Sequence, residues 1–231
     1  MTRYRYILLL AFAAVWIWAA IDPVFRGDWL LENVLVFLFV PAILLAGVYF
    51  RLSSVSYTLI TIFMILHVIG AHYTYERVPF GYTLQHWLGA ERNMYDRLVH
   101  FSFGFLLAYP IREMFMRVSG ARGIWSYFLP FDVTMSFSMV YELIEWAYAA
   151  MAGGEAGAAF LGTQGDEWDA QKDMAMATLG GLISMCTVAL INWKFDRNFG
   201  EELRQSLSVA DGDRPLGEVR LAEIRRQDER K

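Results

Sequence analysis

Cysteine and charged residues are both scarce in this chain. Cys186 is the single cysteine, so neither an internal disulfide nor a thiolate-based metal site can form. Charged residues make up 19% of the 231 residues, against about 25% in a soluble domain, while hydrophobic residues make up 56%. The formal net charge of −4 leaves no basic excess for binding nucleic acid. These shortages exclude a disordered chain, a nucleic-acid binder and an ordinary water-soluble enzyme, and they indicate a membrane protein.

Several catalytic motifs are also missing. The sequence contains no HExxH, no GxSxG and no Ser-x-x-Lys, and it has no glycine-rich loop of the kind that cradles phosphates. A serine or thiol nucleophile and a nucleotide-binding loop therefore have no support. Nothing in the sequence indicates a haem, and no feature specifies an oligomeric state.

Long apolar runs are what the sequence has in abundance. A membrane-spanning helix needs about 20 mostly apolar residues. Six such runs are found: Tyr6 to Ile21, Trp29 to Phe50, Val55 to Ala71, Asp96 to Met116, Ile124 to Met151 and Trp168 to Trp193. The first run resembles a signal peptide, but its best cleavage site lies inside the apolar stretch, so we expect this helix to be retained. The sequence predicts an all-α polytopic membrane protein, a bundle of six transmembrane helices.

Lysine and arginine in the loops set the expected orientation, because these residues favour the cytoplasmic side. An orientation with the N-terminus inside places more of them in the cytoplasm than outside, with the clearest group at Arg112, Arg117 and Arg122. Six spans then put both termini in the cytoplasm, with the protein embedded in the lipid bilayer of a bacterial inner (cytoplasmic) membrane. We expect residues 1–197 to form the transmembrane domain and residues 198–231 to form a charged, flexible cytoplasmic tail.

Ionisable residues are costly inside a membrane, and here they gather at one depth. The expected topology brings six of them near the periplasmic face: Asp96, His100, Glu142, Glu145, Asp169 and Asp173. Spacings of three or four residues put the members from each helix on one face, so that each pair can point inward together.

The excess of negative charge in this cluster predicts a bound metal ion. With Asp166 the cluster holds six carboxylates, against the three fixed cations Arg92, Arg97 and Lys172. So many negative charges cannot stay ionised in a site with little water unless several are protonated or a metal compensates them. Carboxylates with imidazole suit Mn, Fe or Zn, so we expect a divalent transition metal bound by the six residues above. The spacing does not match the Glu-x-x-His pattern of ferritin-like bundles.

Further residues are expected to support these ligands: His72, Tyr73, Arg97, Asp166 and Lys172. Structural explanations compete with this interpretation. Asp166 and Asp169 suit the start of a helix as an N-cap and a first-turn acid. His72 suits an interfacial position, and the two glutamates could be buried as neutral acids or paired with arginine.

Four runs of the sequence resemble the YjdF-like family of bacterial inner-membrane proteins. They are Gly70-Ala-His-Tyr-Thr-Tyr75, Asn93-Met-Tyr-Asp-Arg-Leu-Val-His-Phe101, Tyr141-Glu-Leu-Ile-Glu-Trp146 and Leu161-Gly-Thr-Gln-Gly-Asp-Glu-Trp-Asp-Ala-Gln-Lys-Asp-Met174. The resemblance covers about residues 67 to 185, and the last run is its most specific part. It implies an inner-membrane location and topology but no reaction, because that family is a domain of unknown function.

A fainter similarity is to VanZ-like proteins, which are linked to glycopeptide resistance. It is carried by Asp96-Arg97 with His100-Phe101, by Glu142, and by Asp169 with Asp173 ahead of Gly180-Gly181. Thr178 stands where that pattern usually has asparagine, so little can be carried over.

Three functions fit these observations. The first is a metal-dependent hydrolase that acts on a lipid head group or another amphiphile, without a defined set of catalytic residues. The second is a proton- or cation-coupled transporter that uses the same acids. The third is a non-catalytic accessory protein that binds a lipid or an antibiotic, with a polar core that only fixes helix packing. A measurement of bound metal separates the first function from the other two.

Overall fold

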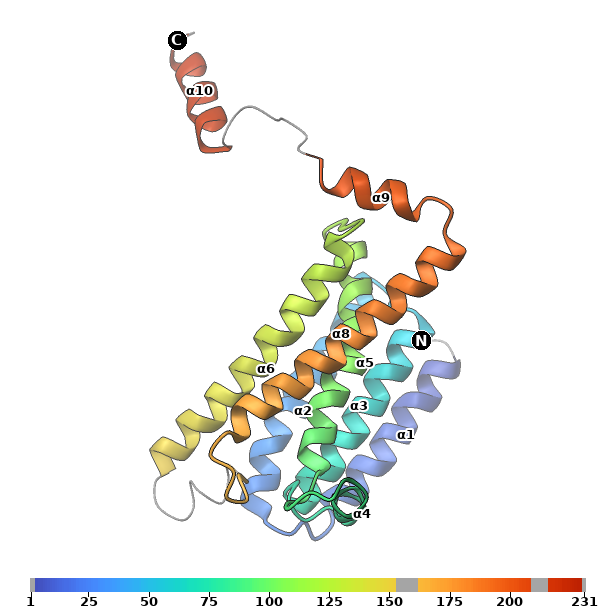
Figure 1. Cartoon of the computed structure of the whole chain (residues 1–231), viewed down its shortest axis with the longest axis vertical. Coiled ribbons are helices and arrows are strands. Elements are labelled where there is room, and N and C mark those ends of the chain that lie inside the picture. Colours follow the sequence, from blue (N-terminus) through green and yellow to red (C-terminus); the bar gives the residue numbers. More distant parts are fainter. Residues whose placement is uncertain (1–2, 153–161, 209–215, 230–231) are drawn as a thin grey trace.

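The computed structural model describes residues 3–152, 162–208 and 216–229, and every regular element in these ranges is a helix. The helices are α1 (Arg3–Ala20), α2 (Arg26–Tyr49), α3 (Ser54–Tyr73), α4 (Pro79–Leu88), α5 (Tyr95–Val118), α6 (Trp125–Ala152), α8 (Asp169–Phe195), α9 (Phe199–Ser206) and α10 (Leu216–Asp228). The long helices run alternately up and down one bundle, and α4 lies across the end where α5 begins (Figure 1). The expected all-α class is confirmed.

Helices α3 and α5 lie at the centre of the bundle. α3 packs on α1 and α5, and α5 packs in turn on α6 and α8. Buried apolar side chains from these two helices form much of the core, among them Phe63, Met64, Val68, Val99 and Leu107. The bundle therefore has an apolar centre, and the polar residues described below gather at one end of it.

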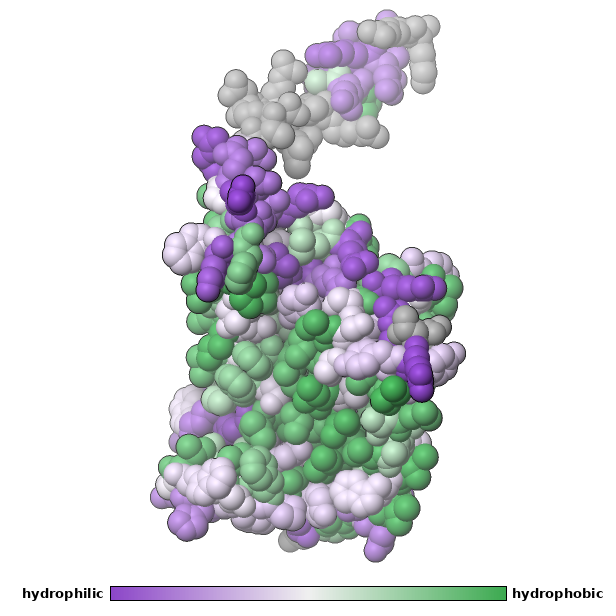
Figure 2. All heavy atoms as spheres, turned by 90° about the vertical axis from the view of Figure 1, so that its right-hand side faces the viewer, coloured by the Kyte–Doolittle hydropathy of each residue, from purple (hydrophilic) through white to green (hydrophobic). Residues whose placement is uncertain are grey.

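Four helices are long and apolar enough to cross a membrane: α1, α2, α3 and α8. Many of their large apolar side chains are exposed, and Figure 2 shows apolar side chains over much of the body of the bundle. The two other expected spans correspond to α5, with 24 residues, and α6, with 28 residues. These helices are long enough but more polar, because they carry much of the ionisable cluster. The chain is thus a membrane protein with four candidate spans.

Two short helices follow the bundle. α9 packs against the turn between α5 and α6, where the Ile124 backbone N–H donates to Ser206 Oγ at 3.0 Å. The Trp125 indole N–H donates to the Ser206 carbonyl, also at 3.0 Å. α10 lies further along the charged C-terminal segment (Figure 1). Hydrophilic side chains are concentrated at this end of the molecule (Figure 2).

Helices α5 and α8 approach each other closely because glycines stand at their crossing. A Cβ on Gly104 would lie 1.9 Å from the Ala177 carbonyl oxygen, and one on Gly180 would lie 2.1 Å from the Phe101 carbonyl oxygen. Contacts this short against backbone atoms leave no room for a side chain. The crossing holds the first turns of α5 against the first turns of α8, which carry the acids and the histidine of the candidate site.

Candidate functional site

The start of α5 is held in place by Asn93. The side-chain oxygen of Asn93 accepts from the Tyr95 backbone N–H, and its amide donates to the Val78 carbonyl, both at 3.0 Å. Gly81 leaves room for this side chain, since a Cβ there would lie 1.7 Å from Asn93 Oδ1. The ionisable residues in the first two turns of α5 therefore project from a fixed backbone.

The segment before α8 is tied to the same point. The Asn93 backbone N–H donates to Gln164 Oε1 at 2.9 Å. Asp166 accepts from the Trp168 backbone N–H at 3.1 Å, so it stabilises the turn that leads into α8. Lys172 donates to both oxygens of Asp166, at 2.9 and 2.8 Å, and this hydrogen bonding holds the pKa of the Asp166 carboxyl below its usual value. Asp166 is therefore not the N-cap of α8, which is Trp168 and has no side-chain capping hydrogen bond; Asp166 stabilises the preceding turn and has a charged partner.

Arg97 connects three acids of the α8 segment. It is 5% exposed, and its Nη2 donates to Asp166 at 3.2 Å and to Asp169 at 2.5 Å. Its Nη1 donates to the Asp169 carbonyl at 3.0 Å and pairs with Asp173 Oδ2. Asp169 and Asp173 share one face of α8, whereas Asp166 precedes the helix and reaches Arg97 from the turn. The guanidinium therefore fixes the orientation of Asp173 through one of its two oxygens.

A second arginine completes the neutralisation of Asp169. Arg92 pairs with Asp169 Oδ1 and lies 3.8 Å from Asp96 and 3.9 Å from Asp166. Asp169 was expected to be a metal ligand, but the structure places the same carboxylate oxygen between Arg92 and Arg97. This position makes Asp169 an anchor for the two arginines.

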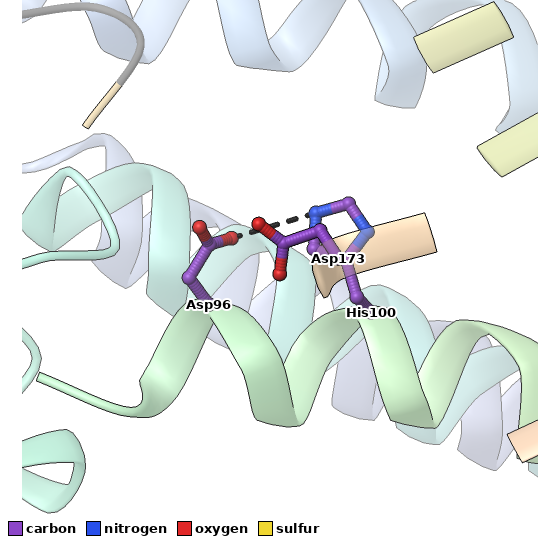
Figure 3. Close-up of side chains that lie close together, drawn as sticks. All are labelled: Asp96, His100 and Asp173. Atoms are coloured by element: carbon purple, nitrogen blue, oxygen red, sulfur yellow. Dashed lines mark ion pairs between the residues drawn. The ribbon is translucent and has the colours of Figure 1, made fainter. Parts of the chain in front are cut away.

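Three of the six expected ligands come together around His100. Ligand atoms of Asp96, His100 and Asp173 all lie within 4.8 Å of one another, and Figure 3 shows the two carboxyl groups beside the imidazole ring. His100 Nε2 lies 3.6 Å from Asp96 Oδ1 and 3.5 Å from Glu142 Oε1. These separations exceed those of ordinary hydrogen bonds. The imidazole nitrogen therefore faces two carboxylates without forming a hydrogen bond to either.

Two buried oxygens at this point lack a hydrogen-bond partner within the part of the chain that the structure describes. They are Asp173 Oδ1 and Glu142 Oε1. Asp173 is 2% exposed and Glu142 is 8% exposed, so bulk water does not compensate for the missing partners. Buried polar atoms are nearly always hydrogen-bonded or bound to an ion. Asp96, His100 and Asp173 are therefore the residues that could hold a metal, and Glu142 lies beside them, 3.5 Å from His100 Nε2. These four residues are called the His100 cluster below.

The remaining expected site residues lie beside this cluster or away from it. Glu145 lines a cleft of about 460 Å³ between the end of α6 and the start of α8, together with Glu142 and Trp146. His72 belongs to the contact between α3 and α1, where its Nδ1 donates to the Ala19 carbonyl at 3.0 Å. The rings of Trp18 and Tyr73 lie 4.7 and 4.5 Å from the His72 ring, measured between centroids. His72 and Tyr73 therefore contribute to helix packing in this structure.

A second polar group behind the cluster was not singled out from the sequence. Glu32 on α2 accepts from the Tyr141 hydroxyl at 2.8 Å, and the Tyr141 ring lies 6.1 Å from the His100 ring. His67 Nε2 donates to the Glu32 carbonyl at 3.1 Å, so its Nδ1 accepts from the Tyr75 hydroxyl at 2.6 Å. A lone carboxylate inside the apolar second run was the signal that could have identified Glu32.

Comparison with known proteins agrees with this architecture. Residues 4–194 match the family described as predicted membrane protein, DUF2238. The inner membrane protein YjdF of Escherichia coli strain K12 is 38% identical over 192 residues, which are 83% of this chain and 91% of that protein. No solved structure matches the chain. The resemblance to the YjdF-like family is confirmed, and the location is the inner membrane, which the chain crosses several times. The chain belongs to the DUF2238 family of membrane proteins.

Proposed function

We propose that the His100 cluster binds one divalent transition-metal ion. The observation that carries this proposal is the spacing around His100 Nε2, which lies 3.5 and 3.6 Å from two carboxylate oxygens without hydrogen-bonding to them. Two ligand atoms bound at about 2.1 Å to one ion in a tetrahedral arrangement lie about 3.4 Å apart. The unpartnered Oδ1 of Asp173 supports the proposal, because an ion would satisfy it, and the unpartnered Oε1 of Glu142 lies beside the same imidazole.

The donor set selects the kind of ion. One imidazole with up to three carboxylates favours Mn, Fe or Zn, whereas Mg and Ca prefer oxygen ligands alone. Arg97 holds Asp173 Oδ2 and leaves Oδ1 free, which is the usual way in which a neighbouring group orients a metal ligand. Because Arg97 offsets the charge of Asp173, a divalent ion balances the two other carboxylates of the cluster.

The chemistry that such an ion supplies is the activation of water for hydrolysis. A metal held by Asp96, His100 and Asp173 would activate water for attack on an ester or phosphodiester bond. Glu142 belongs to the His100 cluster and also lines the neighbouring cleft, so a substrate in that cleft would reach the ion. We propose that the protein hydrolyses a bond in the head group of a lipid or another amphiphile.

Hydrolysis can be tested on the purified protein loaded with Mn or Zn. The protein is incubated with a panel of ester and phosphodiester amphiphiles, and products are identified by mass spectrometry. We expect turnover that stops when a chelator removes the metal and resumes when the metal is restored. A metal-loaded protein that leaves the whole panel intact would argue for a non-catalytic metal site.

A second candidate function is proton- or cation-coupled transport. The hydrogen-bonded pair of Glu32 and Tyr141 favours it, because the pair extends the polar residues from the His100 cluster into α2. Purified protein in liposomes that contain a pH-sensitive dye separates the two functions. Proton flux that Glu32→Gln abolishes and a chelator leaves unchanged would favour transport over hydrolysis.

We also propose that α5 and α6 cross the membrane, which gives six spans, with residues 1–197 as the transmembrane domain and residues 198–231 as a cytoplasmic tail. The alternating direction of the long helices and the arginines near the α5–α6 turn support this topology (Figure 1). A fluorescent-protein fusion at the C-terminus is then expected to fluoresce, and an alkaline phosphatase fusion there is expected to be inactive. The reverse pattern would place the C-terminus in the periplasm and move the His100 cluster to the cytoplasmic side.

A further inference from the structure

The described ionisable side chains that line the cleft beside the His100 cluster are all acidic. Its described lining includes five acids, Glu142, Glu145, Asp166, Glu167 and Asp169, and no lysine or arginine. Lys172, Arg92 and Arg97 already offset Asp166 and Asp169.

Two other acids of the cleft, Glu145 and Glu167, have no lysine or arginine paired with them among the described residues. Glu142 provides a second, independent sign of a ligand. Its side chain is 8% exposed, and its Oε1 has no hydrogen-bond partner in the described ranges. A buried carboxylate in this state needs a cation or a hydrogen-bond donor.

The surroundings of the cleft are apolar and aromatic. Trp146 lines it and is 65% exposed, and tryptophan is the side chain that best attracts an organic cation to its ring face. Leu143 and Ile144 on the same helix are 52% and 60% exposed. In a bilayer these side chains would face lipid tails, so an aliphatic chain beside α6 could stay in the lipid while its head group enters the cleft.

We propose that this cleft binds the ammonium head group of a cationic amphiphile. Glu145 and Glu167 supply the carboxylates that pair with the ammonium group, and Trp146 supplies the aromatic surface. The proposal rests on the proposed function, because it names the substrate class of that same site. It also accounts for the acid-lined cleft, since carboxylates without a paired lysine or arginine disfavour an anionic head group.

Binding can be measured with soluble short-chain probes on the full-length protein in a maltoside detergent. Hexyltrimethylammonium is titrated by calorimetry, and hexanesulfonate and hexanol serve as probes with the same tail and a different head. We expect saturable binding of hexyltrimethylammonium only.

The double variant Glu145→Gln with Glu167→Gln is expected to weaken the binding of hexyltrimethylammonium roughly tenfold, and Trp146→Leu is expected to weaken it as well. Glu91→Gln, at an exposed acid outside the described lining of the cleft, is the matched control and is expected to bind as the wild type does.

Equal binding of the ammonium and the sulfonate probe would overturn the proposal, as would a double variant that binds like the wild type. Glu167 is exposed, so Glu167→Gln alone tests the charge of the cleft even if the double variant fails to fold. Metal content measured on the same samples separates the two proposals. Metal without ammonium binding would remove only the cationic substrate, whereas ammonium binding without metal would remove only the metal-dependent reaction.

Discussion

Replacing Arg97 by methionine is expected to lower the free energy of unfolding by about 3–5 kcal/mol, because the substitution leaves buried charges without their partner. Arg97 is 5% exposed and contacts Asp166, Asp169 and Asp173 at once. Methionine keeps most of the side-chain volume and removes every one of these hydrogen bonds. The loss is measured from the reversible unfolding of the purified protein in mixed micelles.

Arg77→Met is the matched control for this variant. Arg77 pairs with its neighbour Glu76 at 3.3 Å, and the two side chains are 49% and 31% exposed. Exposed pairs contribute about 0–1 kcal/mol, so this change is expected to be nearly neutral. If both variants lose the same small amount of stability, the arginine at the centre of the acids is not what holds α5 and α8 together.

Removing a metal ligand is expected to weaken metal binding by more than about 100-fold, since loss of even an outer-shell partner costs about 10–100-fold. His100→Ala removes the imidazole, and Asp173→Asn removes a carboxylate whose free oxygen faces the cluster. Affinity is measured by competition with a metal-sensitive dye on protein stripped with a chelator.

The chain offers a matched control histidine. His86 lies exposed on α4, so His86→Ala changes the histidine content without touching the His100 cluster. We expect His86→Ala to bind metal as the wild type does. Equal loss in the His86 and His100 variants would mean that the metal binds to surface histidines.

The sequence predicted well those features that depend on spacing along one helix. Asp96 and His100 are four residues apart and share the face that looks toward α8. Asp169 and Asp173, four residues apart on α8, both face Arg97 as their spacing indicated, whereas Asp166 reaches Arg97 from the turn before the helix. Their common depth could also be predicted, because ionisable residues near the ends of antiparallel helices meet at the same end of a bundle.

The sequence could not predict which side chains of different helices form ion pairs, because this depends on the side-chain geometry at the crossing of α5 and α8. A count of charges does not assign each arginine to a particular acid. In the structure both arginines pair with Asp169, and neither pairs with Glu142. Glu32 was missed for a related reason. Its hydrogen-bond partner, Tyr141, stands 109 positions away on a helix that only the fold brings beside α2.

Elemental analysis tests most directly whether the His100 cluster holds a metal. The protein is purified without a chelator and without a histidine tag, and its metal content is compared with that of His100→Ala. We predict about one equivalent of Mn, Fe or Zn in the wild type, as the size of the ligand set requires, and a marked loss in the variant. Less than about a tenth of an equivalent, with no uptake of added Mn, Fe or Zn, would contradict this prediction and leave proton transfer and helix packing as the roles of these acids.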